Sequence, residues 1–485
     1  MNVNSIKKNF LYNTCFQILQ IIIPLITTPY ISRVLGADGI GSYSYYYTIA
    51  AYFVLFILLG LNNYGNREIA RIRDDRKKLS STFWNIYTMQ LIMGILVSIL
   101  YIAFTVLFAK EKIIAFILML YIVSGVLDIN WFYFGMEQFK LITIRNSLIK
   151  ILTTVLIFLL VKSRSDLYVY TLIMAGGMLI SQAVMWLPVF QHIDFVMPSF
   201  REIVRHIRPN CVLFITVIAV SVFKMMDKIM LGAMSSTQQV GFYESAEKII
   251  LIPQALITSL GTVMLPRMSN IGTEGRTGQN LIRKSLFTAM LLSSVLSFGI
   301  ISVARDFVPL FYGPGFEVCI SLYYILLPSC LFLAFANVIR TQYLLPAGMD
   351  RPYVVSAVAG AVVNFAVNYA LIPSMGAVGA ALATTLAEII VCLIQVWAVR
   401  NRLPVAGYVK MVLPGICLGI LMCAGVMAVP SAESELMSLI LKTAAGGLIC
   451  VLGAALLYAI SSSFRQNVQA VLPLQKLSRL FGKQN

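Results

Sequence analysis

Charged side chains are scarce in this chain. Asp, Glu, Lys and Arg make up 12% of its 485 residues, whereas soluble globular domains carry roughly 25%. No polar stretch is long enough to form a soluble domain of its own, and 59% of the residues are hydrophobic. The composition therefore predicts an all-α, polytopic membrane protein, because closely spaced apolar spans must satisfy their backbone hydrogen bonds within helices.

Residues for metal, redox or nucleotide chemistry are also few. The two histidines, His192 and His206, share one loop, and the eight cysteines stand singly without a CxxC motif. This set lacks the grouped ligands of a structural zinc site, and no GxxxxGK[ST] motif is present. We expect no metal and no resident cofactor. The outer loops are short and hold no histidine, so we also predict that the chain is not a membrane glycosyltransferase, polymerase, ligase or other enzyme.

The long apolar stretches define the predicted helices, since about 20 apolar residues cross a bilayer. We predict fourteen membrane spans, with twelve as the alternative. The fifth is short as drawn and is expected to start near Ser147. The spans cover residues 11–32, 41–61, 83–108, 113–134, 151–161, 167–190, 211–233, 241–263, 286–304, 320–346, 353–372, 377–399, 411–429 and 437–461.

The distribution of positive charge predicts the orientation. The formal net charge is +17, but the cations lie in short loops rather than on one basic face, so we expect no nucleic-acid partner. With the N-terminus inside, most Lys and Arg fall in inner segments, which favours two cytoplasmic termini and an even number of spans. The outer loops then hold Arg33, Lys110, Lys112, Lys162, Arg164 and Arg305.

Two neighbouring spans carry mixed charge at helical spacing. The sets are Lys224, Asp227, Lys228 and Glu244, Glu247, Lys248, each spaced i, i+3, i+4. This spacing places each set on one helix face, and ionisable groups within membrane spans usually face a bundle interior or a watery cavity. These two charged spans, which form a helical hairpin, predict a polar transport path. Two alternatives remain open: ion pairs within each set, or a second set that lies at the membrane surface.

The two halves of the chain echo each other. Residues 32–43 (SRVLGADGIGSY) resemble residues 228–243 (KIMLGAMSSTQQVGFY), so that Gly36 matches Gly232 and Gly41 matches Gly241. Gly135-Met136-Glu137 and Gly348-Met349-Asp350 form a second echo. We predict two pseudo-symmetric six-helix lobes around a central cavity, with the substrate path between them. The predicted parts are lobes at 1–190 and 211–399, a linker at 191–210, and two extra C-terminal helices with a basic tail at 400–485.

The linker carries alternating apolar and basic residues. Ile203, Val204 and Ile207 oppose three arginines, Arg201, Arg205 and Arg208. This pattern is typical of an amphipathic helix on the inner membrane face. An ordinary positively charged loop is an equally good interpretation.

Three stretches carry a family resemblance. PYISRVLGADGIGSYSYYYTIAAY (29–52), LGAMSSTQQVGFYESAEKI (231–249) and SMGAVGAALATTLAEII (374–390) resemble the Wzx-type flippases of polysaccharide repeat units. That family shares a superfamily with multidrug and toxin extruders and with lipid II flippases. The resemblance implies a V-shaped bundle that moves undecaprenyl-diphosphate-linked oligosaccharide across the bacterial inner membrane by alternating access, for O-antigen, capsule or exopolysaccharide synthesis. It also implies a polysaccharide polymerase and export machinery as partners.

Such a substrate suggests roles for the ionisable residues. Lys224, Lys228, Lys248 and Arg340 are candidates for the diphosphate, although Arg340 can equally snorkel to the surface. Trp131 is a candidate for stacking on a sugar. Asp128 and Glu388 are candidates for coupling to H⁺ or Na⁺, with helix packing as the alternative for Glu388. An ion-coupled small-molecule exporter and a lipid II flippase remain the alternative functions.

Overall fold

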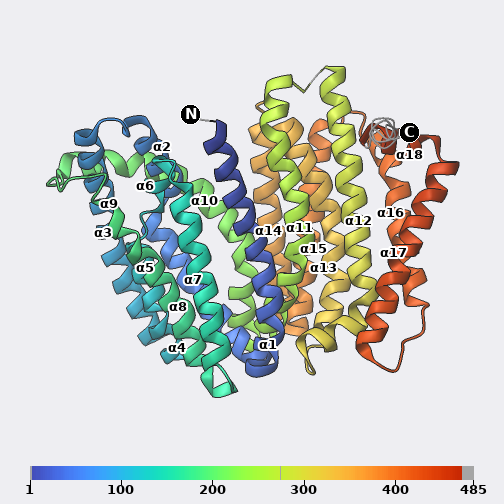
Figure 1. Cartoon of the computed structure of the whole chain (residues 1–485), viewed down its shortest axis with the longest axis horizontal. Coiled ribbons are helices and arrows are strands. Elements are labelled where there is room, and N and C mark those ends of the chain that lie inside the picture. Colours follow the sequence, from blue (N-terminus) through green and yellow to red (C-terminus); the bar gives the residue numbers. More distant parts are fainter. Residues whose placement is uncertain (1–2, 274, 472–485) are drawn as a thin grey trace, which may run out of the picture. The chain divides into compact units, whose positions relative to one another are not determined.

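The chain is helical throughout its described part. The structure, a computed structural model, describes the backbone of residues 3–273 and 275–471 (Figure 1). It describes the side chains of these residues except 3–18, 21, 215, 216, 219, 220 and 222–224. Within this part no residue forms a strand, and twelve helical segments are long and apolar enough to cross a membrane. The predicted all-α polytopic class is confirmed.

The first helices occupy residues 3–234. They are α1 (Val3–Leu58), α2 (Leu61–Ile72), α3 (Arg76–Leu107), α4 (Lys112–Ile117), α5 (Met119–Val126), α6 (Asn130–Gly135), α7 (Phe139–Leu160), the 3₁₀ turn η1 (Arg164–Asp166), α8 (Leu167–Val184), α9 (Trp186–Val189) and α10 (Phe200–Met234).

The remaining helices occupy residues 237–471. They are α11 (Thr237–Ile271), α12 (Arg276–Tyr312), α13 (Val318–Ile339), the π-helical turn η2 (Arg340–Leu344), α14 (Asp350–Met375), α15 (Ala377–Val399), α16 (Val405–Met427), α17 (Glu435–Ile460) and α18 (Ser462–Val471).

Each predicted span falls mainly on helical structure, but several helix boundaries differ: the fourth span, for example, is divided among α4, α5 and α6. The first two spans belong to one helix, α1, which is broken by the non-helical backbone of Gly36 (φ 70°). The fifth starts at Phe139 rather than near Ser147. It can start earlier because neighbouring amide oxygens accept hydrogen bonds from Arg145 inside the bundle. The seventh is part of α10, which already begins at Phe200 and runs through the end of the predicted linker. The total of fourteen stays a prediction.

The chain forms two compact units, Met1–Glu244 and Ser245–Asn485, and the boundary falls within α11. In the first unit, α1, α3, α5 and α8 pack around one apolar core that includes Ile57, Tyr101 and Ile122. A second core joins α2, α3 and α6 through Phe83, Trp131 and neighbouring residues. Apolar side chains on the opposite face of α3 are exposed, as expected for a surface that faces lipid.

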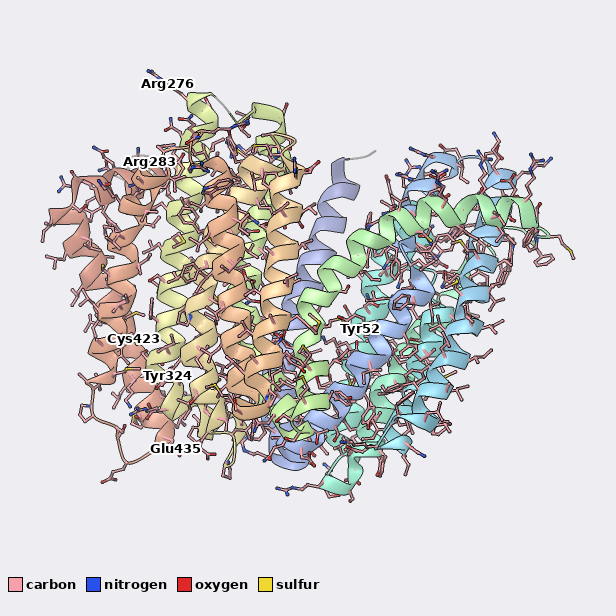
Figure 2. All side chains as sticks on the ribbon, turned by 180° about the vertical axis from the view of Figure 1, so that it is seen from behind. Tyr52, Arg276, Arg283, Tyr324, Cys423 and Glu435 are labelled. Atoms are coloured by element: carbon pink, nitrogen blue, oxygen red, sulfur yellow. The ribbon has the colours of Figure 1, made fainter. Side chains whose placement is uncertain are left out.

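In the second unit, α12 is the central helix. It packs against α13, α16 and α17, while α14 pairs with α15. α17 is attached by an ion pair from Lys442 to Asp306 of α12, with 2.7 Å between Nζ and Oδ2. Arg276 and Arg283 lie at one end of this unit and Glu435 at the other end (Figure 2).

Candidate functional site

The charged hairpin of α10 and α11 forms an ion pair between its two helices. Lys228 Nζ lies 2.6 Å from Glu244 Oε2, and both side chains are largely buried, with 17% and 19% of their surface exposed. The Ser44 hydroxyl of α1 donates to the same Glu244 oxygen at 2.9 Å. The structure therefore brings together two of the predicted residues and adds a hydroxyl from a third helix.

The structure describes the side chains of three of the other four members of the two charged sets. Asp227 is buried, and its carboxylate accepts a hydrogen bond from the Tyr243 hydroxyl at 2.7 Å. Glu247 and Lys248 are half-buried in the part of α11 that belongs to the second unit. The side chain of Lys224 lies outside the described residues. One helix face thus carries residues with different partners, which spacing alone does not reveal.

A group of tyrosines lies near Glu244 in the first unit. The rings of Tyr43 and Tyr47 on α1 stack with centroids 5.6 Å apart. The ring centroids of Tyr43 and Tyr170 of α8 lie 4.9 Å apart, and those of Tyr47 and Tyr121 of α5 lie 5.0 Å apart. Glu244 lies within electrostatic range of Tyr43 and Tyr47. Sequence reasoning missed this group, although the run YSYYY at residues 43–47 was a visible signal.

Asp128 forms a local hydrogen bond at the start of α6. Its Oδ1 accepts a hydrogen bond from the Asn130 backbone nitrogen at 2.8 Å, at the start of α6. Its backbone oxygen accepts from Gln90 Nε2 at 2.8 Å. Arg145 of α7 lies within electrostatic range. Arg145 lies between the fourth and fifth predicted spans, in a segment predicted to be an inner loop, whereas the structure buries it within α7 of the first unit.

The second unit holds two further candidates, Arg340 and Glu388. Arg340 begins the π-helical turn η2, donates from Nη2 to Asn337 Oδ1 at 2.8 Å, and lies 5.7 Å from the ring centroid of Tyr353. Glu388 of α15 is buried and lies within electrostatic range of Arg340. η2 follows α13 and is succeeded by a turn, and π-turns are common at helix C-termini. Arg340 therefore stays a candidate because of its position near Glu388 and not because of this turn.

The proposed role of Trp131 in sugar stacking is wrong. Its side chain is fully buried in the core formed with α3, and its indole nitrogen donates to Gln90 Oε1 at 3.0 Å. A ring with both faces packed has no face for a ligand. Among the residues searched in the described part, no group of at least three His, Cys, Asp and Glu side chains is placed to hold a metal ion.

Comparison with known proteins identifies the family. A family model described as "Polysaccharide biosynthesis protein" matches residues 6–272, which is more than half of the chain. The chain belongs to the polysaccharide biosynthesis protein family. A model described as "Lipid II flippase MurJ" matches residues 154–444. The family assignment confirms the resemblance seen in the sequence.

One curated relative and two solved structures extend the comparison. A protein of Escherichia coli (strain K12) named "Putative O-antigen transporter" is 24% identical over 411 residues, which are 83% of this chain and 99% of that protein. The structure of a lipid II flippase, MurJ, in an inward closed conformation matches with a TM-score of 0.78 at 14% identity, over 93% of this chain and 99% of that one. A multidrug-resistance MATE transporter matches with a TM-score of 0.51 at 14% identity, over 80% and 99%. The structural matches show the fold.

Proposed function

We propose that this family member is a flippase that moves a lipid-linked oligosaccharide from the cytoplasmic to the outer leaflet by alternating access, for the synthesis of surface polysaccharide. The observation that carries the proposal is the relationship to the E. coli O-antigen transporter, which spans almost that whole protein. The family model for polysaccharide biosynthesis proteins and the fold shared with a lipid II flippase support it. The substrate is an oligosaccharide on undecaprenyl diphosphate.

The chemistry of this substrate explains why charged residues belong inside the bundle. Moving a bare diphosphate into hydrocarbon would cost tens of kcal/mol in the idealised limit, roughly the Born cost of an unsolvated ion. A polar path supplies hydrogen-bond donors and cations in place of water, while the lipid tail stays in the bilayer. The protein thus transports without breaking a covalent bond, and no catalytic residue is required.

We assign the substrate path to the charged residues. Lys228 and Arg340 are described cations at half-buried positions. Lys224 and Lys248 complete the predicted set of cations for the diphosphate. Asp227, Glu244 and Glu247 lie on the same helices and would bind sugar hydroxyls or hold the lysines in place. In this proposal the Lys228–Glu244 pair exchanges its partners for substrate during transport.

The driving force is a further part of the proposal. Asp128 and Glu388 are acids within spans and are the candidates for H⁺ or Na⁺ coupling. The membrane potential also favours outward movement of an anion. A doubly charged substrate gains about 4.6 kcal/mol per 100 mV, at roughly 2.3 kcal/mol per charge. No resident cofactor or metal is needed for either mechanism.

We place the protein in the bacterial inner membrane with both termini in the cytoplasm. Its partners in this proposal are the lipid bilayer, the lipid-linked glycan, and a polysaccharide polymerase with export machinery. A lipid II flippase and an ion-coupled small-molecule exporter are the competing functions, since both classes share the fold.

Reconstituted transport tests the function. The full chain is placed in liposomes with a fluorescent undecaprenyl-diphosphate oligosaccharide, and outer-leaflet label is followed by quenching. We expect flipping by the parent protein and slower flipping by Lys228→Ala and Lys248→Ala. Flipping of lipid II alone would favour the lipid II flippase. Failure with several glycans and lipid II, by a folded protein, would refute the flippase and favour the exporter.

A further inference from the structure

Arg145 is a buried guanidinium whose hydrogen-bond acceptors are all neutral. Its Nη2 donates to Asn130 Oδ1 at 3.1 Å and to Asn146 Oδ1 at 2.7 Å, and its Nε donates to Asn146 Oδ1 at 3.2 Å. Its Nη1 donates to the Ser181 carbonyl oxygen and to Gln182 Oε1, both at 3.3 Å. Only 6% of the residue surface is exposed. Amide and carbonyl oxygens thus hold a full positive charge inside the protein.

Neutral acceptors solvate this charge but do not cancel it. Removing a guanidinium from water is expensive, and ionised partners normally compensate buried charges. Asp128 is within electrostatic range of Arg145, but its carboxylate accepts from the Asn130 backbone nitrogen at 2.8 Å and forms no ion pair with the arginine among the described contacts. A buried arginine in a membrane span is a functional-site hypothesis by default.

The groups around Arg145 suit an oxyanion. Asn130, Asn146 and Gln182 are half-buried, whereas Arg145, to which their amide oxygens bond, is buried. An amide can turn its NH₂ group toward an anion in place of its oxygen, and the guanidinium fork matches two phosphate oxygens. α6, α7 and α8 each supply part of this arrangement. It has the chemistry of a phosphate site.

We propose that Arg145, with the side-chain amides of Asn130, Asn146 and Gln182, binds phosphate oxyanions. The identity of the ligand rests on the proposed function: it is the diphosphate of the lipid-linked substrate. Arg145 lies six residues after the start of α7 at Phe139, which is about 9 Å along a helix. In the predicted topology α7 starts at the cytoplasmic side, where the lipid-linked glycan is made. The site would therefore receive the diphosphate early in transport.

A purely structural arginine differs from an anion site in a measurable way. Arg145→Gln removes the charge, and Arg145→Lys keeps the charge but loses the planar fork. Lys150→Gln is the matched control, because it removes one positive charge from the same helix at a half-buried position. A structural role would lower the stability of the Arg145 variants and leave anion affinity in the remaining folded protein unchanged.

The experiment measures binding to the purified full chain in detergent, with inorganic diphosphate, undecaprenyl diphosphate and phosphatidylglycerol as separate probes. For Arg145→Gln we expect binding of the diphosphate probes to weaken about tenfold or more, as for loss of a charge-assisted bidentate contact. The affinity of Arg145→Lys should lie between those of the parent and Arg145→Gln, and Lys150→Gln should bind the probes like the parent. Binding by Arg145→Gln at parental affinity would overturn the proposal.

The probes also identify the source of the anion. Binding of inorganic diphosphate shows that the free anion suffices, whereas binding of undecaprenyl diphosphate alone shows that the lipid is required; either supports a diphosphate site. Equal competition by phosphatidylglycerol would overturn that assignment in favour of a general anionic-lipid contact.

Two further variants and one transport measurement complete the test. If Arg145→Gln does not fold, Asn130→Ala and Gln182→Ala are expected to weaken diphosphate binding roughly threefold to tenfold, the range for loss of one ordinary hydrogen bond. Unchanged binding in both would overturn the proposal. A parent that binds diphosphate but flips no glycan refutes the proposed function and keeps the site. If Arg145→Gln flips the glycan and binds diphosphate as well as the parent does, the anion site is refuted and the proposed function is kept.

Discussion

Gly41 of α1 and Gly241 of α11 cross at backbone contact. A Cβ on Gly41 would stand 2.7 Å from the Gly241 amide nitrogen and 1.7 Å from the Thr237 carbonyl oxygen. A Cβ on Gly241 would stand 1.8 Å from the Ala37 carbonyl oxygen. These glycines hold matching places in the two echoed stretches of the sequence. The positive φ at the break in α1 belongs to Gly36 and not to Gly41. Gly41 is instead needed because it lets the backbones of α1 and α11 approach closely.

Gly41→Ala is therefore expected to destabilise the protein. The obstructing atoms belong to backbone, which cannot rotate away, and overpacking of this kind costs typically about 1–3 kcal/mol or more. Gly176→Ala is the control, because it is also in a membrane helix and has nothing within 4 Å of an added Cβ. Thermal unfolding in detergent measures both. Equal unfolding temperatures for the two variants would contradict the crossing.

The Lys228–Glu244 pair gives a second prediction. Lys228→Met leaves a largely buried carboxylate that keeps its bond from Ser44, and Glu244→Gln leaves a largely buried ammonium. Each single variant should be less stable than the parent, and the double variant should recover part of the loss. We expect a coupling of about 1–3 kcal/mol in the double-mutant cycle, measured by thermal or denaturant unfolding. Additive effects would show that the pair is not coupled.

The sequence was informative about elements and less so about partners. Apolar length located helical structure at every predicted span, and i, i+3, i+4 spacing singled out Lys228 and Glu244. It could not show that Asp227, one residue from Lys228, bonds to Tyr243, because spacing defines a helix face and not the neighbour opposite. Arg145 was missed for the same reason. Its acceptors on α6 and α8 come together only in the folded bundle.

The ion pair of Lys442 with Asp306 is expected to stabilise the attachment of α17. Both side chains are about nine-tenths buried, and Ser438 and Ser431 add hydrogen bonds to the pair at 2.7 and 2.9 Å. Lys442→Met alone leaves a buried carboxylate and should cost about 3–5 kcal/mol. Lys442→Met with Asp306→Leu should recover most of this loss. Unfolding temperatures of the three proteins test this; a double variant less stable than the single would contradict it.

The exposed ion pair of Asp194 with Arg76 predicts a pH dependence of stability. Its carboxylate pairs with Arg76 at 2.7 and 2.8 Å, and this contact holds the pKa of Asp194 below its usual value. Because the folded pKa is the lower one, the contribution to stability is present at neutral pH. It is lost as the pH falls through the folded pKa, below about 4, the ordinary range for an aspartate. Both groups are exposed, so the effect should be small.

Asp194→Asn separates this contribution from other acid effects. The stability difference between parent and variant should be constant from neutral pH down to the ordinary range of aspartate and then shrink. Unfolding temperatures measured in parallel at a series of pH values give the comparison. A difference that grows on acidification would mean that the pKa of Asp194 is raised in the folded protein, opposite to the predicted direction.

The orientation of the second unit can be tested at its two ends. Arg276 and Glu435 are exposed residues at opposite ends of this unit (Figure 2). The positive-inside distribution places Arg276 in the cytoplasm and Glu435 outside. In a chain whose native cysteines are replaced by alanine, we expect Glu435→Cys to react with a membrane-impermeant maleimide on intact spheroplasts. Arg276→Cys should react only after the membrane is opened. The reverse pattern would invert the predicted topology, and labelling of both from outside would contradict a unit that spans the membrane.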